Sequence, residues 1–365
     1  MPDFREIRKR AKLTQAELAA RSGIRQATIS AIENGRSSAH PATVLALAAA
    51  LDVAPELIRA ALNQSQAFGR PQAGARPIEQ MGDDWAFLEG LDMDLRTGFA
   101  RSLVADWTHS STALEGNTIT AGDTLFVLTE GLTISGKSLR EHQELHGHAH
   151  ALGLMAAWAR AQQPIRVEHL HQLHRAVMTG AAIDVFVPIG SWKVEGNGTN
   201  AITTGGETKW HDYAAPNHVP ALIEAWSKSL ARICRDPRLK NGRSKDEAEV
   251  GEALLDAYTD VHLGCTAIHP YADGNGRMAR LLANIPMLRA GRPPLLIDVA
   301  ARRDYIALLG DYSISCGCPI PGDEFVKPGR ERDALRDFFA EQWQATLQRV
   351  AEFHGLQARR RGGSQ

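Results

Sequence analysis

The feature that most constrains the fold is the twelve-residue segment from His269 to Arg280, which reads HPYADGNGRMAR. Before it, residues 246–268 place apolar side chains at helical spacing. Pro270 ends that helix, because proline has no N–H and keeps the preceding residue out of the α region. Helical spacing returns over residues 278–288. The segment is therefore predicted to be a loop between two helices, with His269 at the end of the first.

This loop contains the groups that a phosphate-binding site needs. Gly274 and Gly276 have no Cβ, so an anion can approach their N–H groups where the second helix begins and its dipole is positive. Asp273 can bind Mg²⁺ through a carboxylate oxygen while phosphate oxygens complete the coordination. Arg277 and Arg280 lie three residues apart on one helix face and can bind further phosphate oxygens.

One group of the loop has no phosphate role. Of the side chains in this motif, His269 is the one that can take up a proton near neutral pH, so it is the candidate general base for a hydroxyl nucleophile. The segment resembles the motif of the Fic family, His-Pro-Phe-x-Asp/Glu-Gly-Asn-Gly-Arg-x-x-Arg, with Tyr271 in place of the phenylalanine. The resemblance implies transfer of AMP from ATP to a Ser, Thr or Tyr hydroxyl of a target protein. It implies that His269 is the base and that Asp273 is the Mg²⁺ ligand. It also implies that Gly274, Asn275 and Gly276 form an anion-binding turn. Arg277 and Arg280 would bind the β- and γ-phosphates.

A second motif, SSTALEGN, covers residues 110–117. Ser111 and Glu115 stand one helical turn apart, so both side chains can face the same way. The motif resembles the Fic inhibitory motif, Ser/Thr-x-x-x-Glu-Gly/Asn. That resemblance implies that Glu115 pairs with Arg280 and takes the space of the ATP γ-phosphate, so that ATP binds unproductively. It also implies the class of Fic proteins whose inhibitory helix, here near residues 108–117, precedes the Fic core.

Residues 183–216 interrupt the helical pattern with a β-prone run followed by several glycines. They resemble the Fic flap, a small hairpin that in the family aligns the modifiable segment of the target by strand addition. Lys193 stands where the family commonly has arginine, so we expect no arginine-specific role there. Residues 191–196 also match the letters of the inhibitory motif, with Glu195 as the acid. A turn-rich loop is a poor place for an inhibitory helix, so Glu115 remains the predicted inhibitory residue.

Four histidines lie between residues 141 and 150. His142 and His146 have the i, i+4 spacing that can hold a metal ion, but no third ligand has a recognisable place. We therefore interpret the four histidines as part of a helix surface. The pair Leu173-His174 matches a pair in the Fic pattern and is interpreted as serving packing.

Residues 1–62 are predicted to form a compact unit of short helices. Thr14 and Glu17 make a capping box at the start of one helix, and Gly23 makes the turn into the next, which runs from about residue 26 to 34. A helix, a tight turn and a second helix form a helix-turn-helix. The unit has nine Lys or Arg and six acidic residues, a net charge of +3 that suits phosphate contacts.

The stretch from residue 13 to residue 35 resembles the Cro/Xre repressor family. The resemblance implies that four side chains face the major groove: Arg25, Gln26, Thr28 and Ser30. It also implies that Gln15 contacts a phosphate. Of these, Gln26 can read an adenine edge. The alternative is a helix-turn-helix used only for protein contact or dimerisation, because fold and function separate.

The predicted fold is mainly α, a Fic-type helical core with a small β-hairpin flap plus an N-terminal helix-turn-helix bundle. A Gly-, Pro- and Gln-rich stretch is predicted to be a linker. The predicted parts are the helix-turn-helix domain (1–62), the linker (63–82), the Fic domain (83–312) and a C-terminal helical extension (313–365).

Composition excludes several classes of protein. A net charge of −1 over 365 residues gives no general attraction to nucleic acid or membrane. Four cysteines are too few and too uneven for a disulfide framework, so reduced thiols in a cytoplasmic protein are expected. No apolar run reaches the ~18 residues of a membrane span, and the first residues lack the apolar core of a signal peptide.

Together these features predict an autoinhibited protein adenylyltransferase that uses ATP and Mg²⁺, with a DNA-binding head that contacts an operator and autoregulates transcription. A homodimer is expected, because such heads usually need two-fold symmetry. One alternative keeps the site but removes AMP or transfers another nucleotide. The other is a transcriptional regulator whose core binds nucleotide without turnover. The sequence leaves the target protein, the operator and the release of inhibition open.

Overall fold

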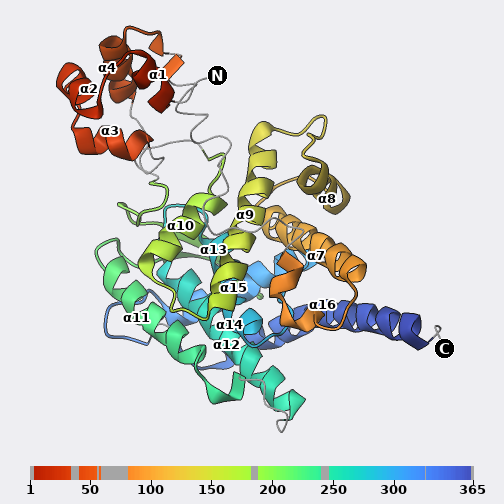
Figure 1. Ribbon diagram of the computed structural model, residues 1–365. Helices are drawn as coiled ribbons and strands as arrows, with labels where there is room; N and C mark the ends of the chain where they lie inside the picture. The colour runs from red at the N-terminus through yellow and green to blue at the C-terminus, as the bar shows by residue number, and fades with distance from the viewer. Residues whose placement is uncertain are drawn as a thin grey trace. The chain divides into compact units, whose positions relative to one another are not determined.

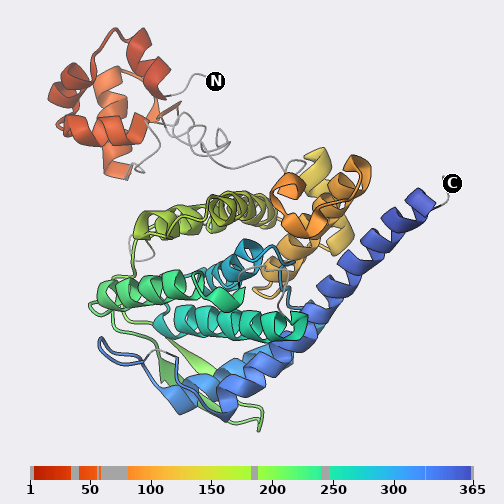
Figure 2. The ribbon, with the colours of Figure 1, turned by 60° about the horizontal axis from the view of Figure 1, so that its bottom comes forward.

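The computed structural model describes residues 4–33, 41–55, 57–58, 81–181, 188–239, 246–324 and 326–362. These residues are mainly helical and contain one two-stranded antiparallel sheet, which confirms the predicted fold class. The chain divides into two compact units, residues 1–73 and 74–365, drawn in Figures 1 and 2. The predicted linker up to residue 80 and the flap segment 183–187 lie outside the described residues.

The first unit, here called the head, is a bundle of short helices: α1 (Phe4–Arg10), α2 (Gln15–Ser22), α3 (Gln26–Glu33) and α4 (Pro41–Leu51). Thr14 begins α2 through a capping box, in which its hydroxyl accepts from Glu17 N and its own N–H donates to the Glu17 carboxylate. Gly23 ends α2 with φ 70°, a left-handed conformation that glycine adopts without steric cost. Helix α2, this turn and α3 form the helix-turn-helix. The apolar side chains buried between the helices include Phe4, Leu18, Ile29, Ile32 and Leu47.

A buried ion pair holds α1 to α3 inside the head. The Glu33 side chain has no exposed surface, and its carboxylate accepts hydrogen bonds from Arg8 Nη2 at 3.1 Å and from Gln15 Nε2 at 2.7 Å. Burial opposes ionisation of Glu33, but the hydrogen bonds and the charge of Arg8 outweigh it and lower the pKa. Arg8 Nη1 also donates to Leu13 O at 2.6 Å. The interior of the head therefore contains a charge that requires its partner.

The second unit is built around α12 (Glu247–Ile268), the helix that ends at His269. Four further helices pack directly on α12: α11 (Val219–Ile233), α13 (Asn275–Leu282), α14 (Ile285–Arg289) and α16 (Arg330–Gly362). The remaining helices are α7 (Met93–Ala113), α8 (Ala121–Glu130), α9 (Leu139–Ala161), α10 (Val167–Val177) and α15 (Arg302–Cys316). Short 3₁₀ turns cover Gly82–Asp84, Ala86–Leu88, Pro237–Leu239 and Val299–Ala301. None of the helices within the described ranges combines the length and the apolar character needed to cross a membrane.

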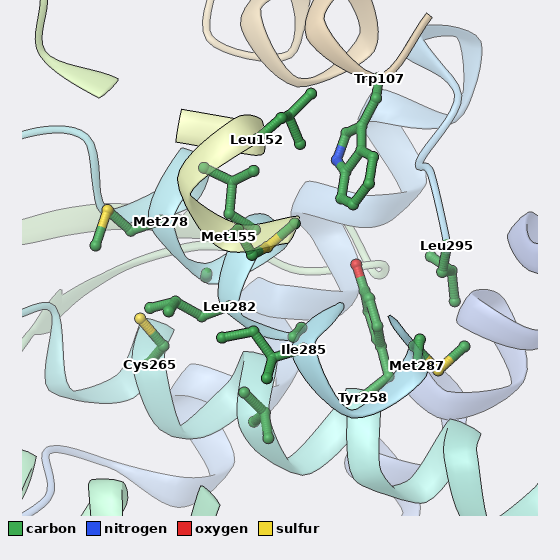
Figure 3. Close-up of a cluster of buried hydrophobic side chains, with 14 of the residues drawn as sticks. Trp107, Leu152, Met155, Tyr258, Cys265, Met278, Leu282, Ile285, Met287 and Leu295 are labelled. Carbon is green, nitrogen blue, oxygen red and sulfur yellow. The ribbon is translucent and has the colours of Figure 1, made fainter. Parts of the chain in front are cut away.

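One hydrophobic core joins these helices, as Figure 3 shows. Its buried side chains come from α7, α9, α12 and α13, and include Trp107, Leu152, Met155, Tyr258, Met278 and Leu282. Burial of such side chains contributes about 25 cal/mol per Å² of apolar area. Packing between α7, α12 and α13 brings the two motifs of the sequence, nearly 160 positions apart, into one place.

The hairpin consists of β1 (Gly198–Ile202) and β2 (Thr208–Asp212), paired antiparallel with Asn200 opposite Trp210. Strand β1 lies against α15. That approach requires Gly310, where a Cβ atom would lie 2.0 Å from Ile202 O. The hairpin is therefore attached to the helical core through its first strand.

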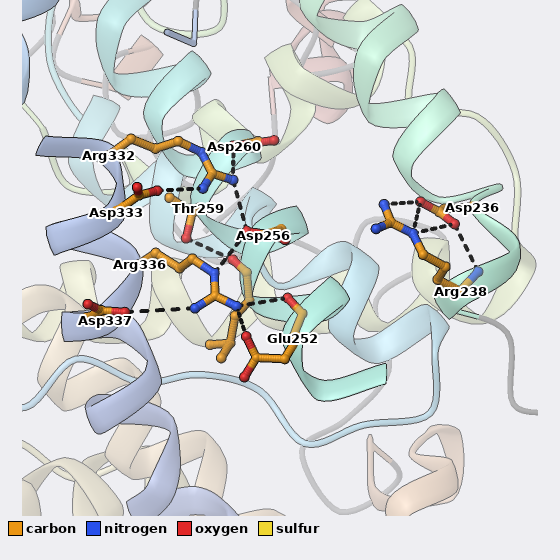
Figure 4. Close-up of polar contacts among 11 residues, drawn as sticks. Asp236, Arg238, Glu252, Asp256, Thr259, Asp260, Arg332, Asp333, Arg336 and Asp337 are labelled. Atoms are coloured by element: carbon orange, nitrogen blue, oxygen red, sulfur yellow. Dashed lines mark hydrogen bonds and ion pairs between the residues drawn. The ribbon is translucent and has the colours of Figure 1, made fainter. Parts of the chain in front are cut away.

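Helix α16 falls within the predicted C-terminal extension but belongs to the core, because Leu335, Phe339 and Trp343 are buried there. In its first turns, Arg332 and Arg336 pair with Asp256 of α12 at 3.1 and 2.9 Å (Figure 4). Further along, Arg349 pairs with Asp106 of α7. Helix α16 thus connects the helix that precedes the loop to the helix that carries the second motif.

Replacing Glu33 with Ala should destabilise the head, because the buried Arg8 guanidinium would lose its charge partner. The expected loss is about 3–5 kcal/mol, measured as faster hydrogen exchange of head amides in the full-length chain. Glu17→Ala is the matched control, since it removes an exposed acid from the capping box and should destabilise the head much less. Equal losses in the two variants would show that the buried pair does not hold the head together.

Candidate active site

The loop between α12 and α13 is defined by two residues in the left-handed conformation. His269 has φ 50° and caps α12, with its N–H donating to Cys265 O at 3.0 Å. Gly274 has φ 78° and precedes α13. A non-glycine residue with positive φ is uncommon and is held in place by its surroundings. The turn therefore directs the His269 side chain and the first N–H groups of α13 from one short segment.

Asn275 closes this loop from inside. Its Oδ1 accepts from Tyr271 N at 2.9 Å, and its Nδ2 donates to Tyr271 O at 2.8 Å. Both residues are buried. The Asn275 side chain therefore fixes the shape of the turn, and its contribution to an anion-binding turn would come from its backbone N–H.

The His269 ring is held in a neutral form suited to accept a proton. It stacks on Tyr213, with the ring centroids 3.7 Å apart and the planes within 7°. Its Nδ1 lies 3.3 Å from Thr266 O, which can only accept, so Nδ1 carries the proton and Nε2 keeps its lone pair. Burial, and then the charge of Lys193, lower the pKa of His269 to about 3.

The start of α13 is a cradle for anions. Arg277 is buried, and its Nε has no hydrogen-bond partner within the described structure. Its Nη2 lies 3.9 Å from Asp273 Oδ1. The Asp273 carboxylate is exposed and accepts from Gly274 N at 2.5 Å. A guanidinium with an unused donor, beside helical N–H groups, fits a phosphate.

The donor set fits Mg²⁺ only together with phosphates. No group of three or more His, Cys, Asp or Glu side chains that could hold a metal occurs in the part of the chain that the structure describes. Asp273 offers one exposed carboxylate beside the cradle. Mg²⁺ typically binds through one or two carboxylates, substrate phosphates and water, so Asp273 would hold it when nucleotide is bound.

Ser111 and Glu115, from the end of α7, meet Arg280 of α13. The Glu115 carboxylate accepts from Arg280 Nη2 at 2.7 Å. Ser111 accepts from Arg280 Nε through Oγ at 3.1 Å and from Nη2 through its backbone oxygen at 2.7 Å. A Cβ atom on Gly276 would lie 2.4 Å from Glu115 Oε1, so the carboxylate lies against the first turn of α13.

The charge of Arg280 keeps this carboxylate ionised. Burial opposes ionisation of Glu115, but the charge and hydrogen bond of Arg280 outweigh it and lower the pKa. The Glu115 side chain is nevertheless 40% exposed, whereas Arg280 is buried. Glu195, the other acid with the letters of the motif, is exposed outside any helix.

Two residues of the site were missed by sequence reasoning. Tyr213 follows β2 in a polar stretch, and no sequence signal indicated that its ring would lie on His269. His174 of α10 does pack, against Tyr271, but it also bonds to the motif loop through Nε2 and Asp273 O at 3.0 Å. The interpretation of the histidines at 142–150 as a helix surface is wrong for His142 and His148, which are buried on α9. Both ring nitrogens of His142 bond to the backbone, at Ile134 N and Ser138 O.

In the head, the predicted DNA-contacting residues lie on and before α3 and at the start of α2. Arg25 and Gln26 are exposed, and Thr28 and Ser30 are half-buried. The Gln15 amide is already bonded to Glu33. A phosphate contact from Gln15 would therefore use its backbone N–H or require the side chain to turn.

Comparison with known families agrees with both units. Residues 4–58 match the helix-turn-helix family, and residues 164–287 match the Fic/DOC family. The chain is therefore a Fic/DOC-domain protein with an N-terminal helix-turn-helix domain. The second motif at Glu115 lies outside the matched Fic/DOC segment.

Its relatives include proteins named as adenylyltransferases. Protein adenylyltransferase fic-1 from Caenorhabditis briggsae is 29% identical over 208 residues, which are 56% of this chain and 35% of that protein. Protein adenylyltransferase Fic from Drosophila melanogaster is 30% identical over 201 residues, which are 55% of this chain and 36% of that protein. The chain spans about a third of the length of these curated relatives.

Solved structures show the same fold at low identity. A Fic domain containing signaling protein from Bacteroides thetaiotaomicron has a TM-score of 0.61 and 22% identity, covering 76% of this chain and 96% of that one. Fic-1 from C. elegans has a TM-score of 0.54 and 19% identity, covering 94% of this chain and 97% of that one.

Two fully buried histidines near Arg280 give the second unit a pH dependence. His262 Nε2 lies 3.0 Å from the Tyr305 hydroxyl, and His148 Nδ1 lies 3.3 Å from Thr108 Oγ1. Burial, and then the charge of Arg280, lower the pKa of each ring to about 3. Both rings are therefore neutral in the folded protein.

Stability should fall as the pH drops below the ordinary histidine pKa of about 6.5. Below that pH His148 and His262 bind protons in the unfolded chain but stay neutral in the folded protein. Each ring should therefore lower the free energy of unfolding by about 2 kcal/mol at pH 5. Urea unfolding at pH 7 and pH 5 measures this, and His262→Gln should reduce the difference by about 2 kcal/mol, the contribution of one ring. Equal stability of the unmodified protein at the two pH values would contradict the neutral burial of the rings.

Proposed function

We propose that the second unit is an autoinhibited protein adenylyltransferase that transfers AMP from ATP to a hydroxyl group of a target protein. The observation that carries the proposal is the position of Glu115, whose carboxylate lies against the cradle formed by Arg280 and the first turn of α13. A carboxylate is the protein's closest counterpart to a phosphate oxygen. Its contact with the first turn of α13, the helix that follows the loop carrying His269, supports this assignment of the phosphate site and of the group that blocks it.

The chemistry follows from His269. Its Nε2 lone pair takes the proton of the target hydroxyl as that oxygen attacks the α-phosphorus of ATP. A new bond forms between the hydroxyl oxygen and the α-phosphorus, the bond from the α-phosphorus to the bridging oxygen breaks, and pyrophosphate leaves. The low pKa keeps the ring unprotonated, and the negative charge of a bound triphosphate would raise its basicity.

The remaining groups bind charge. The backbone N–H groups of Gly274, Asn275 and Gly276 bind the developing negative charge, that of Gly274 after it releases the Asp273 carboxylate to which it donates. Arg277 and Arg280 bind the β- and γ-phosphates. Mg²⁺ on Asp273, when bound, supplies positive charge to the phosphate oxygens.

Inhibition follows from competition for Arg280. A γ-phosphate at Arg280 would bring its charge next to the Glu115 carboxylate, and like charges at contact distance repel strongly when partly buried. ATP must then place its triphosphate elsewhere, which moves the α-phosphorus out of line with the hydroxyl. The names of the relatives support the adenylyltransferase activity. The alternative reaction, removal of AMP from a modified protein, would use the same residues.

We further propose that the head binds a DNA operator through α3 and autoregulates transcription. The exposed Arg25 and Gln26 at the start of α3 support this, because such residues reach base edges in helix-turn-helix proteins. A dimer would match the two-fold symmetry of an operator. If the second unit binds nucleotide without turning it over, DNA binding by the head would make the protein a nucleotide-sensing transcriptional regulator.

The Glu115→Gly variant should label itself or a partner protein when incubated with α-³²P-ATP and Mg²⁺, whereas the unmodified chain labels weakly. Adding His269→Ala should reduce the rate by about 10²-fold or more, since a positioned base contributes 10²–10⁴-fold. Glu195→Gly is the matched control, because it changes the acid with the same surrounding letters and should release nothing. Equal labelling with and without His269 would contradict its role, and mass spectrometry with ATP, UTP and GTP identifies the group transferred.

The head should retard DNA from upstream of its own coding sequence in a gel shift. Retention should weaken as salt rises, because phosphate contacts release counterions. Gln26→Ala should cost about 1–3 kcal/mol on the specific fragment and little on random DNA of equal length. Equal retention of both fragments at all salt concentrations would contradict binding to an operator, and retention of neither fragment would leave the head a protein-contact module.

A further inference from the structure

His174 is a buried imidazole between three parts of the site. It lies on α10, is 1% exposed, and stacks on Tyr271 with the ring centroids 3.7 Å apart and the planes within 5°. Its Nδ1 is 2.8 Å from Gly190 N, at the entry to the flap. Its Nε2 is 3.0 Å from Asp273 O, in the loop. The His174 ring therefore contacts the flap, Tyr271 and the anion-binding turn.

The partners of His174 determine where its proton lies. Gly190 N can only donate, so Nδ1 has no proton and accepts. Asp273 O can only accept, so Nε2 carries the proton and donates. The ring is thus a neutral bridge with a fixed direction, from the flap backbone to the loop backbone.

The bond to Asp273 O also fixes the next N–H group. In a trans peptide the C=O and the following N–H point in opposite directions, so holding Asp273 O directs the N–H of Gly274. Gly274, with φ 78° and no Cβ, has by itself little to hold that peptide plane. In the described structure this N–H donates to Oδ1 of the Asp273 carboxylate, the same group that is assigned to Mg²⁺ binding.

We propose that His174 is a positioning residue that directs the Gly274 N–H toward the phosphate of the nucleotide and keeps the flap in register with the loop. The inference rests on the proposed function of the loop. A positioning role and a packing role of His174 have different requirements. Stacking on Tyr271 needs only an aromatic ring, whereas directing the peptide needs a hydrogen-bond donor at the position of Nε2.

Three substitutions separate these requirements in the full-length Glu115→Gly background. His174→Phe keeps an aromatic ring and removes both hydrogen bonds. His174→Gln places an amide N–H near the position of Nε2, and His174→Asn reaches only the position of Nδ1. The His174→Gln variant should transfer AMP at nearly the rate of the parent. The His174→Phe and His174→Asn variants should have a kcat lower by about 10²-fold, the cost of losing one oriented donor.

The melting temperatures of the variants identify any loss of fold. AMP transfer near the parent rate by His174→Gln but not by His174→Asn supports the inference. Transfer at the parent rate by His174→Phe, or by His174→Asn but not by His174→Gln, overturns it. If the Glu115→Gly parent itself transfers nothing, the proposed function fails first.

A spectroscopic measurement tests the inference without turnover. In protein labelled with ¹⁵N-glycine, inorganic pyrophosphate should shift the Gly274 amide resonance of the parent and of His174→Gln, but leave it nearly unchanged in His174→Phe. The same pyrophosphate-induced shift in the Phe variant would show that the Gly274 N–H does not depend on His174.

Discussion

The contact between Glu115 and Arg280 is the interaction on which the site depends. A buried guanidinium is costly unless it is paired and hydrogen-bonded, and Arg280 finds its partners at the end of α7, on Glu115 and Ser111. The contact therefore draws the second motif onto the first turn of α13. In the proposed function the same acid that satisfies Arg280 would also fill the place that a terminal phosphate needs, so folding and inhibition would use one ion pair.

Helix α16 extends this arrangement beyond the site. Arg332 ties it to Asp256 on α12, and Arg349 ties it to Asp106 on α7. The helix before the loop and α7, which ends at Ala113 just before Glu115, are thus held by a common neighbour. The end of α7 cannot move far from Arg280 unless its contacts with α16 or with the core also change.

Much of the site could be predicted from sequence, because its key groups lie in short motifs with local consequences. Pro270 and the glycines indicated a helix, a turn and a second helix, and the structure has α12 ending at His269 and α13 starting at Asn275. The spacing of Ser111 and Glu115 indicated side chains that face the same way, and both contact Arg280, although α7 ends at Ala113 and Glu115 lies in the turn that follows. Local periodicity could not indicate Tyr213 on His269, His174 on the loop, or α16 in the core, because each depends on packing between distant segments.

The proposed inhibition requires the Glu115 carboxylate to occupy the place of a terminal phosphate. A crystal structure of the Glu115→Gly variant with Mg²⁺ and a non-hydrolysable ATP analogue can show whether it does. We expect the γ-phosphate within hydrogen-bond distance of the Arg280 guanidinium, in the space vacated by the carboxylate. A γ-phosphate bound elsewhere, with Arg280 still bonded only to Ser111 and its protein neighbours, would contradict it.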